Sequence, residues 1–417
     1  MRDRPRVVVT GLGCLSPVGG DVPTTWEAML SGRSGIGQIT QFDPADLPVG
    51  IAGEVQDFDA EARVGRKESR RMSRFSQFAV AASEEALAAS DLSLDTEDRD
   101  RIGVLVASGV GGLKEIEDAT QLLAASGYRR ISPFVVPMMI GDMAAGNVAI
   151  RYDLRGPNFG LVSACASGAH AIGEAAEIIR RGDADIMLAG GSEAAITPLS
   201  VASFIAARAL SESTRPAAEV SRPFDTARDG FVIAEGAAVL VLESEEHALA
   251  RGADILAEIA GYGASADAFH ITAPEPQGRG AVASMRKALD RAHIAPGDVA
   301  YINAHGTSTQ LNDTAEAAAI HRVFGEHAEH VPVSSVKSMT GHLLGAAGAL
   351  ESLACVMALR SKTAPPTINL TDPDPECALN HLTEATGIGA GMALNNSFGF
   401  GGHNATLVFG DYAAGGA

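Results

Sequence analysis

The chain has 417 residues, of which 46% are hydrophobic and 20% charged, which is enough apolar material for one large core or for two halves packed together. Its formal net charge of −19 argues against nucleic-acid binding, which needs an extended positive surface. No run of about 20 uninterrupted apolar residues and no signal peptide is found, so neither a membrane span nor secretion is expected.

Short apolar, often β-branched runs alternate with alanine-rich stretches along the chain. The runs predict buried strands and the alanine-rich stretches predict helices. In chain order we expect a strand at Val7–Thr10, a helix at Phe78–Ala89, a strand at Ile102–Ala107, a helix at Ala166–Arg181, and strands at Ile186–Ala189 and Val239–Leu242. This alternation is typical of βαβ units with largely parallel sheets.

Two pairs of segments repeat each other's plan. The first pair comprises residues 161–179 and 332–359, each of which leads through a polar turn into a helix of small residues. The second pair comprises residues 101–109 and 298–306. The pattern predicts an internal duplication near residue 260, with two similar α/β halves stacked face to face. We expect the halves to cover residues 1–260, with insertions, and 261–412, followed by a disordered tail at 413–417.

The stretch "SACASGAH" surrounds Cys165 with very small side chains. If Val162 ends a strand and Ala166 begins a helix, the thiol lies at a helix N-terminus, where the helix dipole stabilises a thiolate. The small neighbours leave room for a thioester carbonyl. The alternative is an inert buried cysteine, which is our interpretation of the other three, Cys14, Cys355 and Cys377. Four thiols without a C-x-x-C pair also indicate a reducing compartment, and we expect a cytoplasmic protein.

Two histidines stand in glycine-containing turns like that of the cysteine. His305 follows a predicted strand in "NAHGTST", and Lys337 and His342 precede a helix in "VKSMTGHLLGAAG". One cysteine and two histidines suggest acyl transfer, with the imidazoles donating to an oxyanion or relaying protons. A Cys–His–Asn hydrolase is the competing interpretation. No phosphate-binding or metal-binding pattern is found, so no cofactor and no metal are expected.

These motifs, together with the glycine-rich turn "NSFGFGG" near the C-terminus, resemble those of the β-ketoacyl-[acyl carrier protein] synthase II family of elongating ketosynthases. The resemblance covers nearly the whole chain. It implies the thiolase-like fold, a layered α-β-α-β-α sandwich. It also implies fatty acid biosynthesis by decarboxylative Claisen condensation of malonyl-carrier protein with an acyl chain.

The resemblance assigns the catalytic roles. Cys165 holds the acyl chain as a thioester, and His305 and His342 bind the malonyl thioester oxygen during decarboxylation. The backbone N–H groups of Cys165 and Phe400 form an oxyanion hole, and Phe400 also resembles a gate between the two substrate sites. A homodimer is expected.

Further residues match the family's supporting positions. Lys337 is expected to pair with Glu351, and Asp313 and Glu316 resemble supporting acids beside the first histidine loop. Two apolar side chains are expected to line the acyl pocket, namely Val110 and Phe204.

A basic run, "GRKESRRMSR", stands out on this acidic chain. It is either a solvated helix face or part of a docking site for an acidic carrier protein. The resemblance places six residues in that docking site: Lys67, Arg70, Arg71, Arg129, Arg130 and Arg208. The spacing of the first three predicts one helical face.

Three departures from the family pattern leave the preferred acyl chain open: His403 replaces a frequent threonine, Ile205 a frequent glycine, and "AEGAA" the commoner "GEGAG". A ketosynthase of a type II polyketide system, with the same chemistry, is the nearest alternative. A non-catalytic chain-length factor is disfavoured by Cys165. A degradative thiolase is disfavoured because the C-terminal loop lacks a second cysteine.

Overall fold

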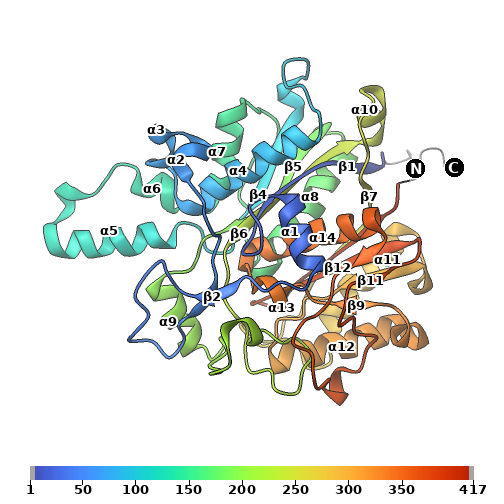
Figure 1. Ribbon diagram of the computed structural model, residues 1–417. Coiled ribbons are helices and arrows are strands. Elements are labelled where there is room, and N and C mark those ends of the chain that lie inside the picture. Colours follow the sequence, from blue (N-terminus) through green and yellow to red (C-terminus); the bar gives the residue numbers. More distant parts are fainter. Residues whose placement is uncertain (1–4, 413–417) are drawn as a thin grey trace.

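A computed structural model describes residues 5–412 (Figure 1). The expected tail at 413–417 lies outside these residues. Nine strands form one mixed sheet in the order β4-β5-β6-β1-β7-β13-β12-β8-β9. Their bounds are β1 Val7–Leu15, β4 Ile102–Ala107, β5 Ile186–Glu193, β6 Gly236–Ser244, β7 Ala257–Ala266, β8 Val299–Asn303, β9 Val333–Ser334, β12 Met392–Gly399 and β13 His403–Gly410.

The pairing pattern is the same on both sides of the middle of this sheet. On one side, β4 and β5 are parallel, and β5–β6 and β6–β1 are antiparallel. On the other side, β8 and β12 are parallel, and β12–β13 and β13–β7 are antiparallel. Within residues 5–412, the two sets are joined in the sheet by a short antiparallel contact between β1 and β7. The expected fold of two similar α/β halves is therefore confirmed, whereas the division at residue 260 stays a prediction. The expectation of largely parallel sheets is wrong, because five of the eight strand pairings in this sheet are antiparallel.

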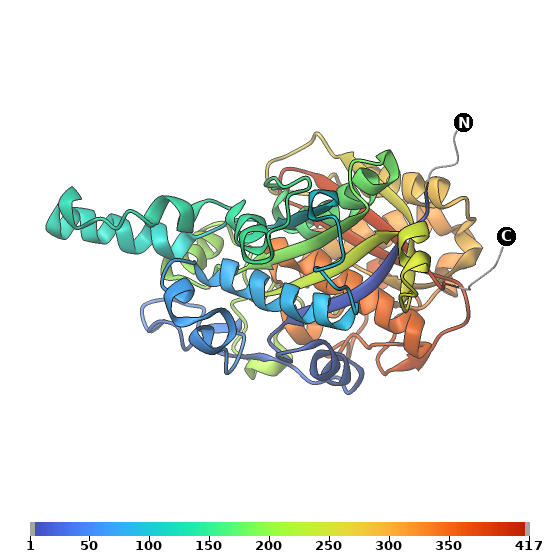
Figure 2. The ribbon, with the colours of Figure 1, turned by 90° about the horizontal axis from the view of Figure 1, so that it is seen from above.

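Helices form three layers around these two sets of strands (Figures 1 and 2). α8 (Ser167–Arg181) and α14 (Ala347–Ser361) pack against each other in the central layer. α4 (Arg74–Ala89) and α7 (Met143–Tyr152) cover the outer face of the first set. α11 (Arg279–Ala292) and α12 (Gln310–Phe324) cover that of the second. Three clusters of buried apolar side chains fill the space between the layers, as expected for a layered sandwich.

The small residues near Cys165 permit the close contact between α8 and α14. A Cβ atom added at Gly168 would lie 2.9 Å from the backbone nitrogen of Ala349, and one added at Gly348 would lie 2.8 Å from that of Ala169. Larger side chains would push the two helix N-termini apart.

One helical stretch of the described chain, Leu344–Ser361, is long and apolar enough to cross a membrane by length and composition. Most of it, 83%, is buried inside the protein. It contains α14 and is therefore the central core helix, whose apolar length is explained by its burial.

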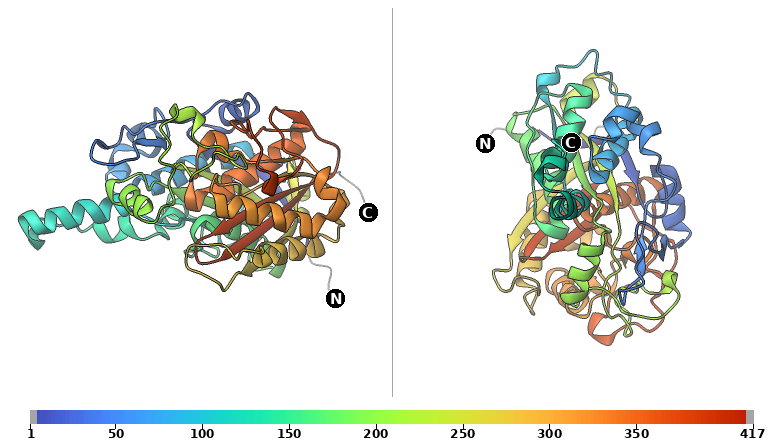
Figure 3. Two further views of the ribbon diagram at one scale, coloured as in Figure 1. Left: turned by 90° about the horizontal axis from the view of Figure 1, so that it is seen from below. Right: turned by 90° about the vertical axis from the view of Figure 1, so that its left-hand side faces the viewer.

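An arm projects from the first half (Figures 1, 2 and 3). It consists of α5 (Leu113–Ser126), the 3₁₀ turn η2 (Tyr128–Arg130) and α6 (Val135–Met139), and no residue of these three elements is buried. The remaining elements are α1 Val22–Leu30, β2 Ile36–Gln38, β3 Ile51–Gly53, α2 Ala60–Val64, α3 Arg66–Ser69, α9 Pro198–Ala206, α10 Glu245–Ala250, α13 Lys337–Thr340, β10 Thr363–Ala364 and β11 Thr386–Gly387.

The expected strand ending at Val162 is wrong. Residues around it form no strand, and Val162 is 64% exposed. Asn158 makes a single bridge to Val104 in β4. Pro157 lacks an N–H group and Gly160 favours no extended pairing, so this segment follows the sheet edge without joining it.

Candidate active site

Four segments from both halves meet at one cavity of about 420 Å³. The turn before α8 supplies Cys165, and the end of β8 supplies His305. The turn after α13 supplies His342, the end of β12 supplies Phe398, and the β12–β13 connection supplies Phe400. The structure therefore brings together the cysteine, both histidines and the glycine-rich turn that the sequence singled out.

Cys165 lies in a 3₁₀ turn, Ala164–Ala166, which leads into α8. Ala164 has a φ of 51°, a left-handed conformation that is unusual for a residue with a side chain. Gly399 lies so close that an added Cβ would be 3.1 Å from the Cys165 nitrogen. The backbone N–H of Phe400 faces the thiol and lowers its pKa.

The protonation of Cys165 differs from the sequence-based expectation. Burial is the largest influence and raises the pKa of the thiol to about 12, while the Lys337 charge and the Phe400 N–H act in the opposite direction. In the free protein the stabilisation expected from the helix N-terminus is therefore outweighed, and the thiol form dominates at neutral pH.

His305 and His342 face each other edge to face, with ring centroids 5.5 Å apart, and both are 2% exposed. Burial, reinforced by the nearby Lys337 charge, lowers the pKa of both rings well below the usual value, so both are neutral. Neither ring nitrogen of His342 has a hydrogen-bond partner within residues 5–412. Each neutral imidazole carries one ring N–H group, which can donate a hydrogen bond to a carbonyl oxygen in the cavity.

Lys337 fixes the orientation of His305. Its buried ammonium donates to the His305 carbonyl oxygen at 2.6 Å and lies 3.2 Å from Nδ1 of the same residue. An ammonium can only donate, so Nδ1 accepts and the ring proton is on Nε2. The structure also places Lys337 in a buried ion pair with Glu351.

Glu316 shapes the turn that contains His305. Its carboxylate accepts the backbone N–H groups of His305 and Gly306, each at 2.8 Å, and the side-chain amide of Asn396 at 3.2 Å. Burial raises the pKa of Glu316 to about 7. Glu316 therefore acts on the histidine through the backbone.

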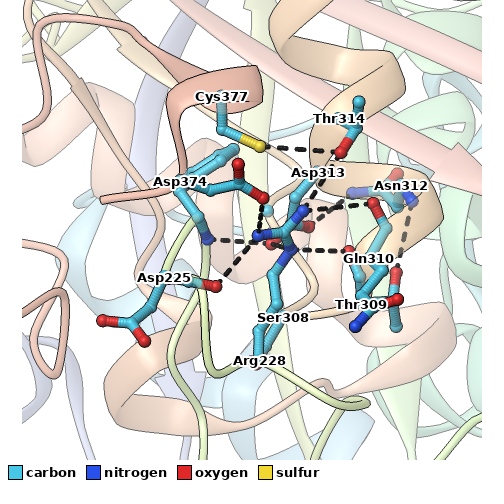
Figure 4. Close-up of polar contacts among 12 residues, drawn as sticks. Asp225, Arg228, Ser308, Thr309, Gln310, Asn312, Asp313, Thr314, Asp374 and Cys377 are labelled. Carbon is cyan, nitrogen blue, oxygen red and sulfur yellow. Dashed lines mark hydrogen bonds and ion pairs between the residues drawn. The ribbon is translucent and has the colours of Figure 1, made fainter. Parts of the chain in front are cut away.

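Asp313 belongs to a buried ion cluster behind the cavity (Figure 4). It accepts the backbone N–H of Phe224 at 2.9 Å and lies 3.6 Å from the guanidinium of Arg228. Arg228 also donates to Asp374 at 2.7 Å and to Thr314 at 3.0 Å. This cluster ties the start of α12 to two loops. Among residues 5–412, no group of three or more acidic, histidine or cysteine side chains is arranged to hold a metal ion.

Phe400 lies in a turn that is tied to a neighbouring loop. Gly401 and Gly402 have φ values of 85° and 74°, which only glycine adopts readily. Gly401 donates its N–H to the carbonyl of Ile271 at 2.7 Å, and Gly402 accepts from the N–H of Asp267 at 2.9 Å. The turn therefore closes one side of the cavity.

Phe231 is a residue for which the sequence suggested no role. Its ring stacks edge to face on His342, at 5.2 Å between centroids, and on Phe204, at 5.3 Å. A ring contact between residues that are far apart in the sequence leaves no local signal. Phe231 links the apolar side of the site to the histidines.

The two residues expected in the acyl pocket have different surroundings. Phe204, on α9, packs against an apolar cluster that includes Leu344 and that also contacts Cys165 and Ile205. Val110 lies in the turn after β4 and is 40% exposed. Neither is among the described residues that line the 420 Å³ cavity.

The six basic residues come from three separate parts of the chain, and all are exposed. Arg208 lines the cavity. Arg129 and Arg130 belong to η2 on the arm. Lys67 lies in α3 and is followed by Arg70 and Arg71.

The single helical face predicted for Lys67, Arg70 and Arg71 is wrong. α3 has only four residues and ends at Ser69, and the chain turns before α4 begins at Arg74. Arg74, the last basic residue of the same run, forms a salt bridge with the buried Glu235 at 2.7 Å. Arg74 therefore has a structural role in the folded protein.

A buried thiol, two neutral histidines and an apolar wall lie between the two similar α/β halves of a thiolase-like fold. Family models identify the group. The model of the β-ketoacyl synthase N-terminal domain matches residues 4–248, and that of the C-terminal domain matches residues 256–371. The chain belongs to the β-ketoacyl synthase family, and it is an acyltransferase of the ketosynthase type.

Individual relatives match nearly the whole chain. It is 50% identical over 411 residues to a 3-oxoacyl-[acyl-carrier-protein] synthase 2 of Synechocystis, covering 98% of this chain and 99% of the relative. It is also 50% identical over 416 residues to a protein of the same name from Staphylococcus aureus, covering 99% and 100%.

Solved structures agree with the fold. A β-ketoacyl synthase from Burkholderia phymatum is 38% identical, with a TM-score of 0.91 and coverage of 98% and 100%. A second structure, a type II polyketide synthase acyl-carrier protein in complex with its ketosynthase bound to the hexaketide, matches at 36% identity and a TM-score of 0.91, with coverage of 99% and 100%.

Proposed function

We propose that this protein elongates fatty acyl chains as a β-ketoacyl-[acyl carrier protein] synthase, with Cys165 as nucleophile. The observation that carries the proposal is the meeting of the Cys165 thiol with two neutral histidines in one cavity. The names of the relatives at 50% identity support the choice of substrates.

In the first half-reaction, the sulfur of Cys165 attacks the carbonyl carbon of an acyl-carrier thioester. The carbonyl oxygen becomes negative, and the backbone N–H groups of Cys165 and Phe400 donate to it. The carrier's thiolate then leaves and takes up the proton that the Cys165 thiol releases. The acyl group is now bound to Cys165 as a thioester.

In the second half-reaction, a malonyl-carrier thioester occupies the same cavity. Nε2–H of His305 and a ring N–H of His342 donate to its carbonyl oxygen, stabilising the enolate as carbon dioxide departs. The enolate carbon attacks the Cys165 thioester, forming the new carbon–carbon bond and releasing the cysteine sulfur, which is reprotonated. Lys337 supports this step because it keeps the His305 proton on Nε2.

The carrier protein docks at the exposed basic residues described above. An acidic carrier and an acidic enzyme repel each other at long range, so a local positive patch provides the attraction. The patch consists of basic residues in and after α3, basic residues of the arm, and Arg208. Arg208 lines the cavity through which a carrier-bound chain enters.

The protein acts as a cytoplasmic homodimer. Large apolar side chains are exposed on the arm, on α7 and along the unpaired sheet edge, where a monomer would leave them in water. They are Val110, Ile116, Leu122, Leu123, Tyr128, Val136, Met139, Ile140, Ile150, Phe159 and Val162. Sedimentation that shows only monomer at micromolar concentration would contradict this assignment.

A polyketide ketosynthase is the second candidate function. It is favoured by the similarity to the ketosynthase of a type II polyketide system. Incubation with hexanoyl- and malonyl-carrier protein separates the two: a fatty acid enzyme makes one product, longer by two carbons, whereas a polyketide enzyme adds several units. Cys165→Ala should make neither product, and any product from it would refute the nucleophile.

A further inference from the structure

Glu193 is a buried carboxylate that the proposed reaction does not use. It ends β5 beside the cavity and is 0% exposed. A buried charge is costly unless it is paired or fully hydrogen-bonded. No cationic side chain of residues 5–412 forms a salt bridge with it, so its hydrogen bonds alone offset the cost of burial.

Four donors meet at this carboxylate, two on each oxygen. Oε1 accepts from the Ser108 hydroxyl at 2.7 Å and from the Val110 N–H at 3.3 Å. Oε2 accepts from the N–H groups of Gly109 at 2.8 Å and Gly345 at 3.0 Å. Only a carboxylate can accept from all four, because a glutamine would turn its own N–H₂ toward N–H donors.

The donors belong to two segments that are far apart in the sequence. Ser108, Gly109 and Val110 form the turn after β4, and Ser108 also accepts the N–H of Gly111 at 2.9 Å. Gly345 lies in the 3₁₀ turn Leu344–Ala346 between His342 and α14. Glu193 therefore joins a turn of the first half to a turn of the second.

Both segments border the reaction site. The first ends at Val110, and the second begins two residues after His342. A Cβ added at Gly109 would lie 3.3 Å from the Gly345 nitrogen and 3.4 Å from the carbonyl oxygen of Ala164, directly before Cys165. The Glu193 carboxylate thus holds these two turns together, and the turn that contains Cys165 lies against the first of them at Gly109.

We propose that Glu193 is a positioning residue that holds the acyl-pocket turn, Ser108–Val110, at a fixed separation from the turn that follows His342. Acyl-chain selection and malonyl decarboxylation both depend on this one carboxylate. The inference rests on the proposed function and on the prediction that Val110 belongs to the acyl wall.

The test compares Glu193→Gln with Glu243→Gln in the full-length protein. Glu243 is also 0% exposed, and it lies at the opposite end of the same β5–β6 ladder, paired with Ile186, about 23 Å away at about 3.3 Å per residue. Both variants lose a buried carboxylate and some stability, but only Glu193 touches the two turns.

Two rates are measured at a temperature where all proteins are folded: carbon dioxide release from malonyl-carrier protein, and transfer of acyl chains of six to sixteen carbons to the enzyme. We expect Glu193→Gln to slow decarboxylation and to change the ratio of kcat/KM between the longest and shortest chains, each by about tenfold or more. Glu243→Gln should keep the wild-type ratio and rate. If Glu193→Gln shows wild-type behaviour in either assay, the inference is overturned.

If Glu193→Gln does not fold, the inference is tested with Ser108→Ala, which keeps the carboxylate and removes one of its donors. Ser108→Ala should slow decarboxylation and change the chain-length ratio in the same direction as expected for Glu193→Gln, but by a smaller factor. If both rates stay at the wild-type values in Ser108→Ala, the inference is overturned. A wild-type protein that does not condense acyl and malonyl units at all would instead refute the proposed function.

Discussion

Lys337 offers a test that separates catalytic positioning from folding. In Lys337→Met the ammonium no longer donates to the carbonyl and Nδ1 of His305, and Glu351 is left buried without its partner. Removing one member of a buried ion pair costs about 3–5 kcal/mol of the free energy of unfolding. The double variant Lys337→Met/Glu351→Leu should recover most of this loss, because no charge is then left buried.

Decarboxylation should not recover in the double variant. A hydrogen bond to a charged group is worth about 1.5–3 kcal/mol, and a loss of that size in the transition state corresponds to a rate decrease of about 10- to 150-fold. Without the ammonium, the His305 proton is no longer held on Nε2, where it is needed to stabilise the enolate.

The assay measures carbon dioxide release from malonyl-carrier protein, with urea unfolding as the stability control. Wild type, Lys337→Met and the double variant are compared at equal folded fraction. If the double variant is stable and decarboxylates at the wild-type rate, Lys337 has only a structural role, and the reasoning about the His305 tautomer is refuted.

Three further predictions follow from the structure. His305→Ala and His342→Ala should each lower decarboxylation by at least about a hundredfold, the effect of removing an oxyanion donor, while mass spectrometry still detects acyl uptake; normal decarboxylation would exclude their role. Arg70→Glu together with Arg71→Glu should raise KM for carrier-protein substrates by at least about fourfold, because each exposed pair, worth about 0.2–1 kcal/mol, becomes repulsive; equal losses with a short thioester lacking the carrier would instead indicate a structural role. Hydrogen bonds of His247 with Glu243 and Glu97 raise the pKa of its ring above the usual 6.5. The protonated ring therefore contributes fully to the free energy of unfolding below pH 6.5, and this contribution is lost as the pH rises through the folded-state pKa. The difference in Tm between wild type and His247→Gln should therefore shrink from pH 6 to pH 9, and a constant difference would contradict the assignment.

Strands whose signal is local were predictable from the sequence. The run Ile102–Ala107 is β4 to the residue, because six consecutive buried positions select apolar side chains. β1 was predicted only as far as Thr10, yet it continues to Leu15 through Gly11 and Gly13. These glycines allow α4 to approach the strand, a tertiary contact that local propensity does not reveal.

In the candidate site too, residues in local motifs were predictable from the sequence, whereas residues defined by distant contacts were not. Cys165, His305 and His342 stand in motifs with strong local character, and the structure places them at one cavity. Glu193 and Phe231 were missed because their partners come from distant segments. The protonation state of Cys165 was also misjudged, since it depends on burial between two halves rather than on the helix that follows it.

The central claim is that Cys165 carries the growing chain as a thioester. It is tested most directly by incubating the purified protein with an acyl-carrier protein and measuring the masses of its proteolytic peptides. The account predicts one acyl group, on the peptide that contains Cys165, which disappears when malonyl-carrier protein is added while a chain two carbons longer appears on the carrier. An acyl group on any other residue, or one on Cys165 that malonyl-carrier protein does not remove, would contradict it.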